Sequence, residues 1–263
     1  MLKEIILAIQ SFRDAHRFIN RHKLWKWIII PGVLYMLMFG AGVWLFWQTS
    51  TFIITTILTE TGLKEWLAAM QDDWWNLLVV LAQVILWLTL LMFYFSIFKY
   101  LFLILGAPLF AWLSEKTESA IEGIEFKFSW KALLHDVWRA AKIALRNLMW
   151  QCVYMIFIFL LSFVPVVGWA APVFSLLIEC YYFGFSMLDY TCERNRLNAA
   201  ESIRFIGNHK GLAIGNGIMF FAMHLIPIAG WLLAPSYAVI AATLSIIKLK
   251  NQEAQLLPAE IQE

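Results

Sequence analysis

Charged residues are scarce in this chain. Asp, Glu, Lys and Arg make up 14% of its 263 residues, whereas hydrophobic residues make up 62%. A soluble domain carries about 25% charged residues and about 45–50% apolar ones. Folding alone cannot hide so much apolar surface from water, so this shortage of charge excludes an ordinary soluble domain and indicates a membrane protein.

The residues needed for catalysis or metal binding are also few. The three cysteines, Cys152, Cys180 and Cys192, form no CxxC pair and lack the His spacing of a zinc site. No GxxxxGK[ST] loop is present to hold a nucleotide. The pair His135-Asp136 consists of sequence neighbours, which do not face each other on a helix. We therefore expect no enzymatic activity, no cofactor and no metal.

Long uncharged runs take the place of these motifs. Residues Trp27 to Thr59 hold no charge, and Trp74 to Ser114 are interrupted only by Lys99. About 20 apolar residues are enough to cross a bilayer as a helix. Four shorter apolar runs follow, at roughly 148–164, 172–188, 212–226 and 232–247. The pattern predicts an all-α, polytopic integral membrane protein with two long transmembrane helices within 27–114.

The distribution of basic residues predicts the orientation in the membrane. Short cytoplasmic loops collect Lys and Arg because translocating basic residues is disfavoured. The basic segments are 1–26, 115–147, 189–211 and 248–263, whereas 60–73 holds only one Lys among four acidic residues. We therefore expect 60–73 outside and both termini in the cytoplasm. With a net charge of only +2, we expect no nucleic acid partner.

Two of the basic segments have helical apolar spacing. In 1–26 the residues Ile5, Ile9, Phe12, His16 and Ile19 recur at the period of a helix. This pattern fits an amphipathic cytoplasmic helix that lies along the membrane surface, and it fits an ordinary packed helix equally well. Residues 115–147 predict a second cytoplasmic amphipathic helix that continues into the membrane, and 248–263 form a cytoplasmic tail.

An internal repeat organises the second half of the chain. The stretch from Phe163 to Pro172, with Pro165 and Gly168, is echoed by Leu225 to Pro235, with Pro227 and Gly230. Pro and Gly interrupt helices, and neither turn carries a charge. We expect one helical hairpin at 148–188 and another at 212–247.

The membrane depth of the hairpins has two interpretations. Charge-free turns between short runs predict re-entrant hairpins that dip into the bilayer and return, and paired interrupted runs are typical of transport sites. The alternative is a set of four thin, tilted crossings. Charge counting cannot separate the two, since both leave every basic segment inside.

Several short motifs, in order along most of the chain, resemble the CysZ-type sulfate permeases grouped with the etoposide-induced-protein membrane family. They are Ile28-Ile29-Ile30-Pro31, Gly106-Ala107-Pro108-Leu109, Leu113-Ser114-Glu115-Lys116-Thr117-Glu118, Pro165-Val166-Val167-Gly168, Leu188-Asp189-Tyr190, Arg204, His209-Lys210-Gly211-Leu212 and Ile226-Pro227. The resemblance implies an inner-membrane sulfate conduit with two long transmembrane helices, half-membrane hairpins and a homo-oligomeric assembly.

The resemblance also implies a sulfate site. A Gly-Leu-Arg-like stretch before the family's first long helix is associated with sulfate, and it matches Lys23-Leu24-Trp25-Lys26 here. Trp25 replaces a frequent Arg, and Leu109 replaces a usual Phe. With Arg21, the stretch would offer cations and helix N-terminal amides to an oxyanion. The other interpretation is that these basic side chains only reach the membrane border.

Ionisable residues within apolar runs form the second candidate group. Such residues usually face a partner or a wet cavity, because a charge in hydrocarbon is costly. Lys99 and Glu179 could form a pair that is structural or part of an ion path, and His224 could be titratable or simply hydrogen-bonded in the bundle. We expect Asp189 to anchor Arg194 or Arg204.

The sequence thus predicts passive or ion-coupled uptake of an inorganic anion such as sulfate, through the lipid bilayer of the inner membrane. The alternative is a non-transporting scaffold or partner-binding membrane protein of the same family. If Lys26, Lys99 and Glu179 converge on a wet cavity, transport is favoured; if they face lipid or are fully paired, the scaffold is favoured.

Overall fold

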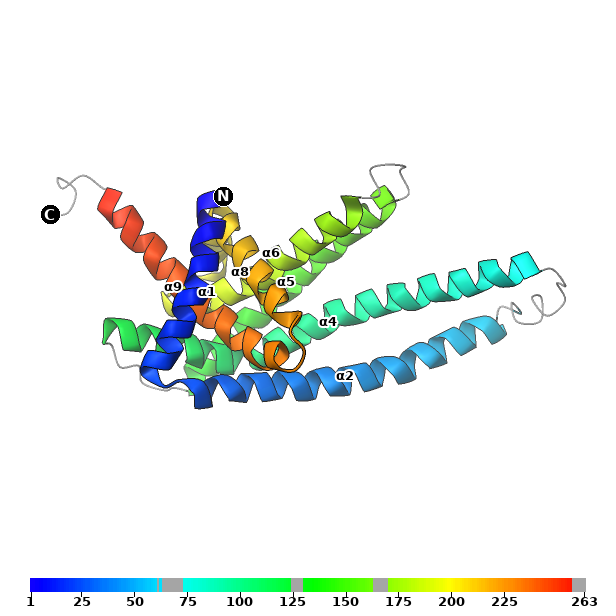
Figure 1. Cartoon of the computed structure of the whole chain (residues 1–263), viewed down its shortest axis with the longest axis horizontal. Coiled ribbons are helices and arrows are strands. Elements are labelled where there is room, and N and C mark those ends of the chain that lie inside the picture. The colour runs from blue at the N-terminus through cyan, green and yellow to red at the C-terminus, as the bar shows by residue number, and fades with distance from the viewer. Residues whose placement is uncertain (61, 63–72, 124–129, 163–169, 257–263) are drawn as a thin grey trace. The chain divides into compact units, whose positions relative to one another are not determined.

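The computed structural model describes residues 1–60, 62, 73–123, 130–162 and 170–256. The regular elements within these ranges are all α-helices, which confirms the predicted all-α class for this part of the chain (Figure 1). They are α1 (Leu2–His22), α2 (Trp25–Glu60), α4 (Asp73–Glu122), α5 (Trp130–Ser162), α6 (Ala171–Arg194), α7 (Ala199–Asn208), α8 (Lys210–His224) and α9 (Ala229–Leu256).

The helices belong to two units. The first contains Met1–Met36 and Leu103–Glu263, and the second contains Leu37–Phe102. In the second unit, the hydroxyl of Tyr94 donates to the carbonyl of Gly42, and the Phe39 and Phe98 rings meet edge to face with centroids 5.9 Å apart. Aromatic contacts of this kind join its two apolar helical segments without any charge.

Small residues let α6 and α8 cross closely at the centre of the first unit. A Cβ added to Gly184 would lie 1.9 Å from the carbonyl oxygen of Ala213, and one added to Gly217 would lie 2.0 Å from that of Cys180. Only glycine fits at both places, because real Cβ atoms never approach a carbonyl so closely. Small residues are typical of helix contacts in membranes for this reason.

The α1 helix packs against α8 and α9 in the same unit. Its buried face holds Leu7, Ala8, Ser11, Phe12, Ala15 and Ile19. The predicted stripe is therefore only partly buried: Phe12 and Ile19 are in the core, whereas Ile9 is 39% exposed. The buried face of α1 is rotated relative to the predicted stripe. The reason is that α1 packs its backbone and small side chains closely against two glycines of α8, Gly211 and Gly215.

Three buried hydroxyls join α4, α6 and α9. The side-chain oxygen of Thr243 lies 3.1 Å from that of Ser114 and 3.0 Å from that of Thr191. All three residues are fully buried. Hydroxyls can donate and accept at once, so this cluster satisfies its polar atoms without a charge in the core.

Within the described residues, three helical segments are long and apolar enough to cross a membrane: Trp25–Ile53, Phe98–Ile121 and Ala229–Gln252. The first two lie in the region where the sequence predicts two long helices. The third span is longer than predicted, since the sequence predicts only a short hairpin arm at 232–247. The α9 helix is longer because its backbone continues past the apolar run through Lys248, Lys250 and Gln252.

The second hairpin therefore pairs unequal helices. The α8 helix has 15 residues, which gives it a length of about 22 Å at 1.5 Å per residue. A bilayer core is about 30 Å thick. The α8 helix is too short for a full perpendicular crossing, whereas α9 is long enough.

Candidate functional site

The chain turns sharply between α1 and α2, at the stretch that the sequence predicts as the sulfate site. Lys23 ends α1 in the left-handed conformation, with φ 52° and ψ 39°. The amide of Leu24 donates to the carbonyl of Ile19 at 3.1 Å, and α2 begins at the next residue, Trp25. The left-handed residue closes the end of α1 and aims the chain into the first candidate span.

Side chains from both helices and from α9 hold this corner. Leu24 is buried, and the indole of Trp25 donates to the Asn20 side-chain oxygen at 2.9 Å. The Asn20 amide nitrogen lies 3.1 Å from one ring nitrogen of His16, and the other ring nitrogen lies 2.8 Å from the hydroxyl of Tyr237. Leu24 and Trp25, predicted as substrate contacts, are thus engaged in positioning the corner.

The corner also presents donors that an anion can use. The Leu24 carbonyl accepts from the amides of Trp27 and Ile28, whereas no backbone carbonyl of the described residues accepts from those of Trp25 and Lys26. The side chains of Arg21, Lys23 and Lys26 are exposed. Free amides at a helix start and nearby cations are the elements of an oxyanion site.

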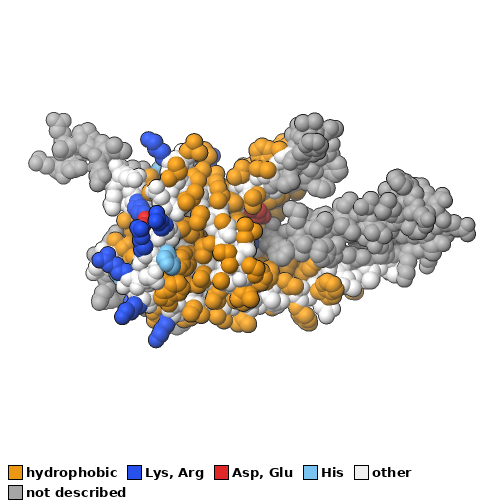
Figure 2. Space-filling model, viewed as in Figure 1, with side chains coloured by type: hydrophobic (Ala, Val, Ile, Leu, Met, Phe, Trp, Pro, Cys, Tyr) orange, Lys and Arg blue, Asp and Glu red, His pale blue; other side chains and the backbone are white. Residues whose placement is uncertain are grey.

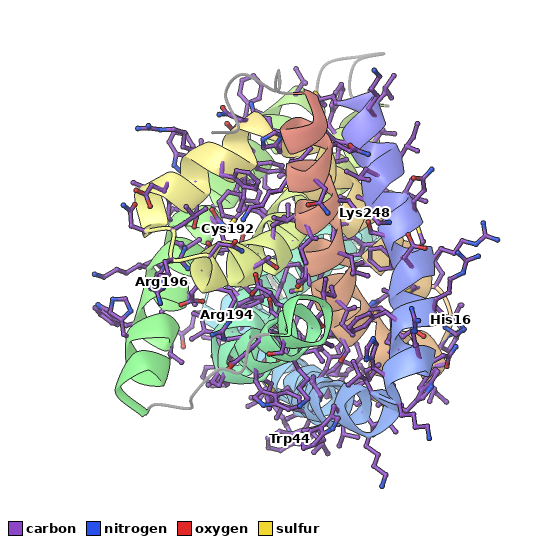
Figure 3. All side chains as sticks on the ribbon, turned by 90° about the vertical axis from the view of Figure 1, so that its left-hand side faces the viewer. His16, Trp44, Cys192, Arg194, Arg196 and Lys248 are labelled. Carbon is purple, nitrogen blue, oxygen red and sulfur yellow. The ribbon has the colours of Figure 1, made fainter. Side chains whose placement is uncertain are left out.

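A groove lies beside the C-terminal half of α1, which precedes the corner in the chain. It has a volume of about 350 Å³ and is lined by Asp14, Arg17, Phe18, Arg21, His22, Ala120, Ile121 and Leu244. Lys and Arg side chains gather on the side of the molecule where α1 lies, while hydrophobic side chains cover the middle of the same face (Figure 2). Lys248 extends from α9 beside α1 (Figure 3) and pairs with Asp14.

The three predicted ionisable residues have different surroundings. The Lys99 ammonium lies 4.8 Å from the centroid of the Tyr100 ring, within the second unit. Glu179 belongs to the first unit, where it accepts a hydrogen bond from Gln151. The predicted pairing of Lys99 with Glu179 would join the two units and stays a prediction. His224 Nε2 lies 2.9 Å from the Tyr35 hydroxyl.

The turn of the second hairpin is apolar and exposed, as its lack of charge suggests. Leu225, Ile226 and Ile228 are 83%, 58% and 65% exposed. The Trp231 indole donates to the His224 carbonyl at 3.1 Å and so caps the end of α8. A Cβ on Gly230 would lie 1.8 Å from the Met223 carbonyl oxygen, so the turn requires glycine there. Gly230 and Trp231, which the two copies of the repeat share in type, thus each have a local role in this turn.

Of the other predicted turn residues, the structure describes Pro172, Pro227 and Pro235. Pro165 and Gly168 lie outside the described residues. Pro172 lies in the first turn of α6, where its missing N–H costs nothing. Pro227 is exposed in the second turn, and Pro235 is inside α9.

A buried ion cluster joins α5, α6 and α7. The Arg139 guanidinium donates to both carboxylate oxygens of Asp189, at 3.1 and 2.9 Å, and also to the hydroxyl of Ser202. Glu193 lies 3.7 Å from the same guanidinium. Arg139 is 8% exposed and Asp189 3%. The bidentate geometry fixes the three helices relative to one another.

This cluster corrects the expectation that Asp189 anchors Arg194 or Arg204. Arg194 instead pairs with Glu115 of α4 at 3.0 Å, and Arg204 is exposed. Asp189 forms its ion pair with Arg139, which is 50 residues away in the chain. Burial of the neighbouring Cys192 raises the pKa of its thiol to about 12.

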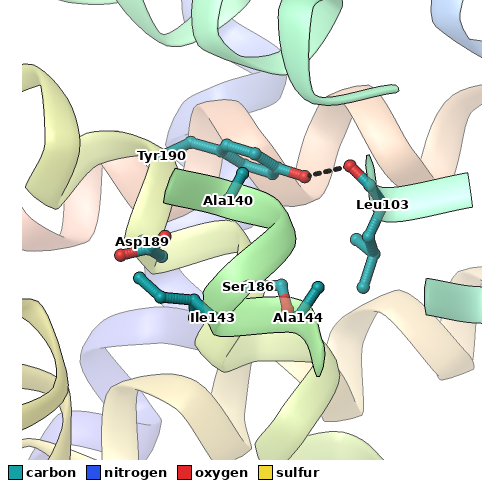
Figure 4. A pocket seen from close by; sticks show the side chains of 7 residues that line it. All are labelled: Leu103, Ala140, Ile143, Ala144, Ser186, Asp189 and Tyr190. Carbon is teal, nitrogen blue, oxygen red and sulfur yellow. Dashed lines mark hydrogen bonds between the residues drawn. The ribbon is translucent and has the colours of Figure 1, made fainter. Parts of the chain in front are cut away.

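A small cavity lies beside the Arg139 cluster (Figure 4). Its volume is about 10 Å³, and it is lined by Leu103, Ala140, Ile143, Ala144, Ser186, Asp189 and Tyr190. The Tyr190 hydroxyl donates to the Leu103 carbonyl at 2.8 Å at its edge. Such a volume admits about one water molecule, so a sulfate ion does not fit. Among the described residues, the exposed corner and the groove are therefore better candidates for an anion than this cavity.

Comparison with known proteins agrees with the sequence motifs. The family model described as "Sulfate transporter CysZ/Etoposide-induced protein 2.4" matches residues 11–235. A sulfate transporter CysZ of Pseudomonas fluorescens is 24% identical over 251 residues, covering 95% of this chain and 96% of that protein. One from Pseudomonas syringae pv. tomato is 26% identical over 247 residues, covering 93% of each.

Proposed function

Since the chain belongs to the sulfate transporter CysZ/etoposide-induced protein 2.4 family, we propose that it carries sulfate or a similar oxyanion across the cell inner membrane. Its relatives match along almost their whole length and are themselves sulfate transporters. The route is passive or ion-coupled, since the sequence contains no nucleotide-binding loop.

The observation that supports an oxyanion most directly is the corner between α1 and α2. Two backbone amides, those of Trp25 and Lys26, have no backbone acceptor among the described residues, and the exposed Lys23 and Lys26 flank them. A sulfate ion that meets this corner receives hydrogen bonds from rigid donors and attraction from two cations. We propose that the corner receives sulfate at the cytoplasmic face.

The proposed topology has two full crossings, α2 and α4, while α9 returns to the cytoplasmic side from the turn that follows the short α8; the basic segments give its orientation. Both termini are cytoplasmic, and the short α8 and its apolar turn form a re-entrant arm. We retain Lys99, Glu179 and His224 as ion-path residues. Homo-oligomeric assembly fits the exposed apolar arms of the first hairpin, where side chains such as Phe157 and Val173 are 64% and 60% exposed.

Uptake by vesicles tests the transport proposal. Purified protein is reconstituted, and entry of labelled sulfate is followed with a sulfate gradient, with and without a proton gradient. We expect faster entry than in empty vesicles, and competition by other oxyanions will report which of them use the same route. Entry no faster than in empty vesicles under both gradients would refute transport and favour the scaffold alternative.

Matched charge changes test the corner. Lys23→Gln and Lys26→Gln together should weaken sulfate binding measured by calorimetry and slow uptake at low sulfate. Lys3→Gln removes a charge from the other end of α1 and serves as the control. If the corner variant and the control bind sulfate equally, the corner is not the site even if transport persists.

Cysteine labelling tests the hairpins. Single cysteines at Ala170 and Ala229, on a background without native cysteines, are treated with an impermeant maleimide from each side of oriented vesicles. The re-entrant topology predicts no labelling from outside at either position. Labelling from outside at both would establish full crossings instead.

A further inference from the structure

The groove beside α1 combines an apolar floor with a cationic rim. Phe18, Ile121 and Leu244 supply apolar side chains from α1, α4 and α9, while α1 also supplies the exposed Arg17, Arg21 and His22. Ile121 is 41% exposed although it is a large apolar residue. Such an amphipathic groove fits a ligand that carries both a negative charge and a hydrocarbon part.

The groove holds more cationic groups than its single carboxylate can neutralise, so it can bind an anion. Asp14 is the groove's one carboxylate, and it is neutralised by Lys248 and by Arg17, whose nitrogen lies 3.6 Å away. The His22 ring packs at a tilt of 36° against the Phe18 ring, with centroids 4.3 Å apart. The Arg21 guanidinium forms no hydrogen bond or ion pair with the described residues. A guanidinium of this kind is suited to bidentate binding of a phosphate.

The position of the groove matches the level of lipid headgroups. The candidate span of α2 begins at Trp25, three residues after His22, and that of α4 ends at Ile121. Both spans therefore meet the membrane border at residues that line or adjoin the groove. The phosphates of the cytoplasmic leaflet lie at this border, and basic side chains there attract anionic lipids.

We propose that the groove is a binding site for an anionic phospholipid, with the headgroup phosphate on Arg21 and Arg17 and an acyl chain along Phe18, Ile121 and Leu244. A lipid in this place would hold α1, α4 and α9 together at the start of α2. Because Arg21 adjoins Lys23, bound lipid would also set the local potential at the corner.

Native mass spectrometry of the delipidated full-length protein tests the site with added phosphatidylglycerol and phosphatidylcholine. We expect tighter binding of phosphatidylglycerol, and Arg21→Gln should weaken it about fivefold, as expected for one basic residue near a membrane surface. The control Arg13→Gln removes the same charge from α1 outside the groove and should leave the affinity unchanged. Equal affinities for the two lipids, or equal effects of the two variants, would overturn the proposal.

Two further arms separate a lipid from a free anion. Ile121→Asn should weaken phosphatidylglycerol binding by removing the acyl contact, while leaving binding of water-soluble glycerol phosphate unchanged. Inorganic sulfate at millimolar concentration should not displace the lipid. If sulfate or glycerol phosphate displaces it and Ile121→Asn has no effect, the groove binds a free oxyanion and the lipid assignment is wrong.

Discussion

Replacing Gly217 with alanine should separate α6 from α8. The new Cβ would lie 2.0 Å from the Cys180 carbonyl oxygen, and ordinary van der Waals contact begins at 3.4 Å, so the backbones must part locally by about 1.4 Å. Overpacking of a core costs about 1–3 kcal/mol, and this backbone clash lies at the upper end. The higher helix propensity of alanine relative to glycine offsets about 1 kcal/mol of this cost. The net expectation is a loss of about 2 kcal/mol.

Thermal unfolding in detergent, followed by tryptophan fluorescence, measures this loss. For a chain of this size 1 kcal/mol corresponds to about 2–4 °C, so Gly217→Ala should lower the apparent midpoint by about 4–8 °C. Gly207→Ala is the control, because a Cβ there meets nothing within 4 Å; its midpoint should stay or rise. A Gly217→Ala protein as stable as the wild type would falsify the close crossing.

Three further predictions concern polar groups of the first unit. Arg139→Met should cost about 3–5 kcal/mol by leaving the Asp189 carboxylate buried without its cation, and adding Asp189→Leu should recover most of that loss in the same unfolding assay. A variant whose only cysteine is Cys192 should react with maleimide far more slowly at pH 8 than one retaining only Cys152, because burial raises the Cys192 pKa to about 12; its rate should rise about tenfold per pH unit as the thiolate forms. Asn198→Ala removes the capping box of α7 and should cost about 1 kcal/mol, whereas Asn198→Ser should retain the stability.

The helical class and the first long helix could be predicted because they depend on composition alone. An uncharged run such as Trp27–Thr59 has no alternative to helix in a bilayer, where every backbone group must be satisfied within the segment. The full length of α9 was missed because its polar end has the same composition as a cytoplasmic tail. The short α7 was also missed, although Asn198 and Glu201 match the capping-box spacing.

The sequence pointed to the residues of the corner as a sulfate site, which stays a prediction, but not to the contacts that hold the corner. The resemblance pointed to residues 23–26, and the structure places a sharp corner there. The Trp25 indole donates to Asn20, whose side chain contacts His16, and His16 in turn contacts Tyr237. Tyr237 belongs to a helix more than 200 residues further along the chain. Sequence spacing carries no information on such contacts.

The partner of Asp189 was missed for the same reason. Arg194 and Arg204 were nearer in the chain, but α5 packs against α6 and brings Arg139 to the carboxylate. One signal was available: Arg139 adjoins Ala140 in a segment predicted to be an amphipathic helix, and an Arg at the edge of a buried helix face requires an acidic partner.

The packing of α1 against α8 and α9 sets a condition on biogenesis. The α1 helix leaves the ribosome before α8 and α9, so its buried face is not covered until they follow. At about 5–20 residues per second, α9 is completed about 10–50 s after α1. During that interval the exposed Phe12 and Ile19 need a substitute partner, which the membrane surface or a chaperone can provide. Truncating the chain before α9 should therefore destabilise the packing of α1 as severely as that of the helices next to the truncation.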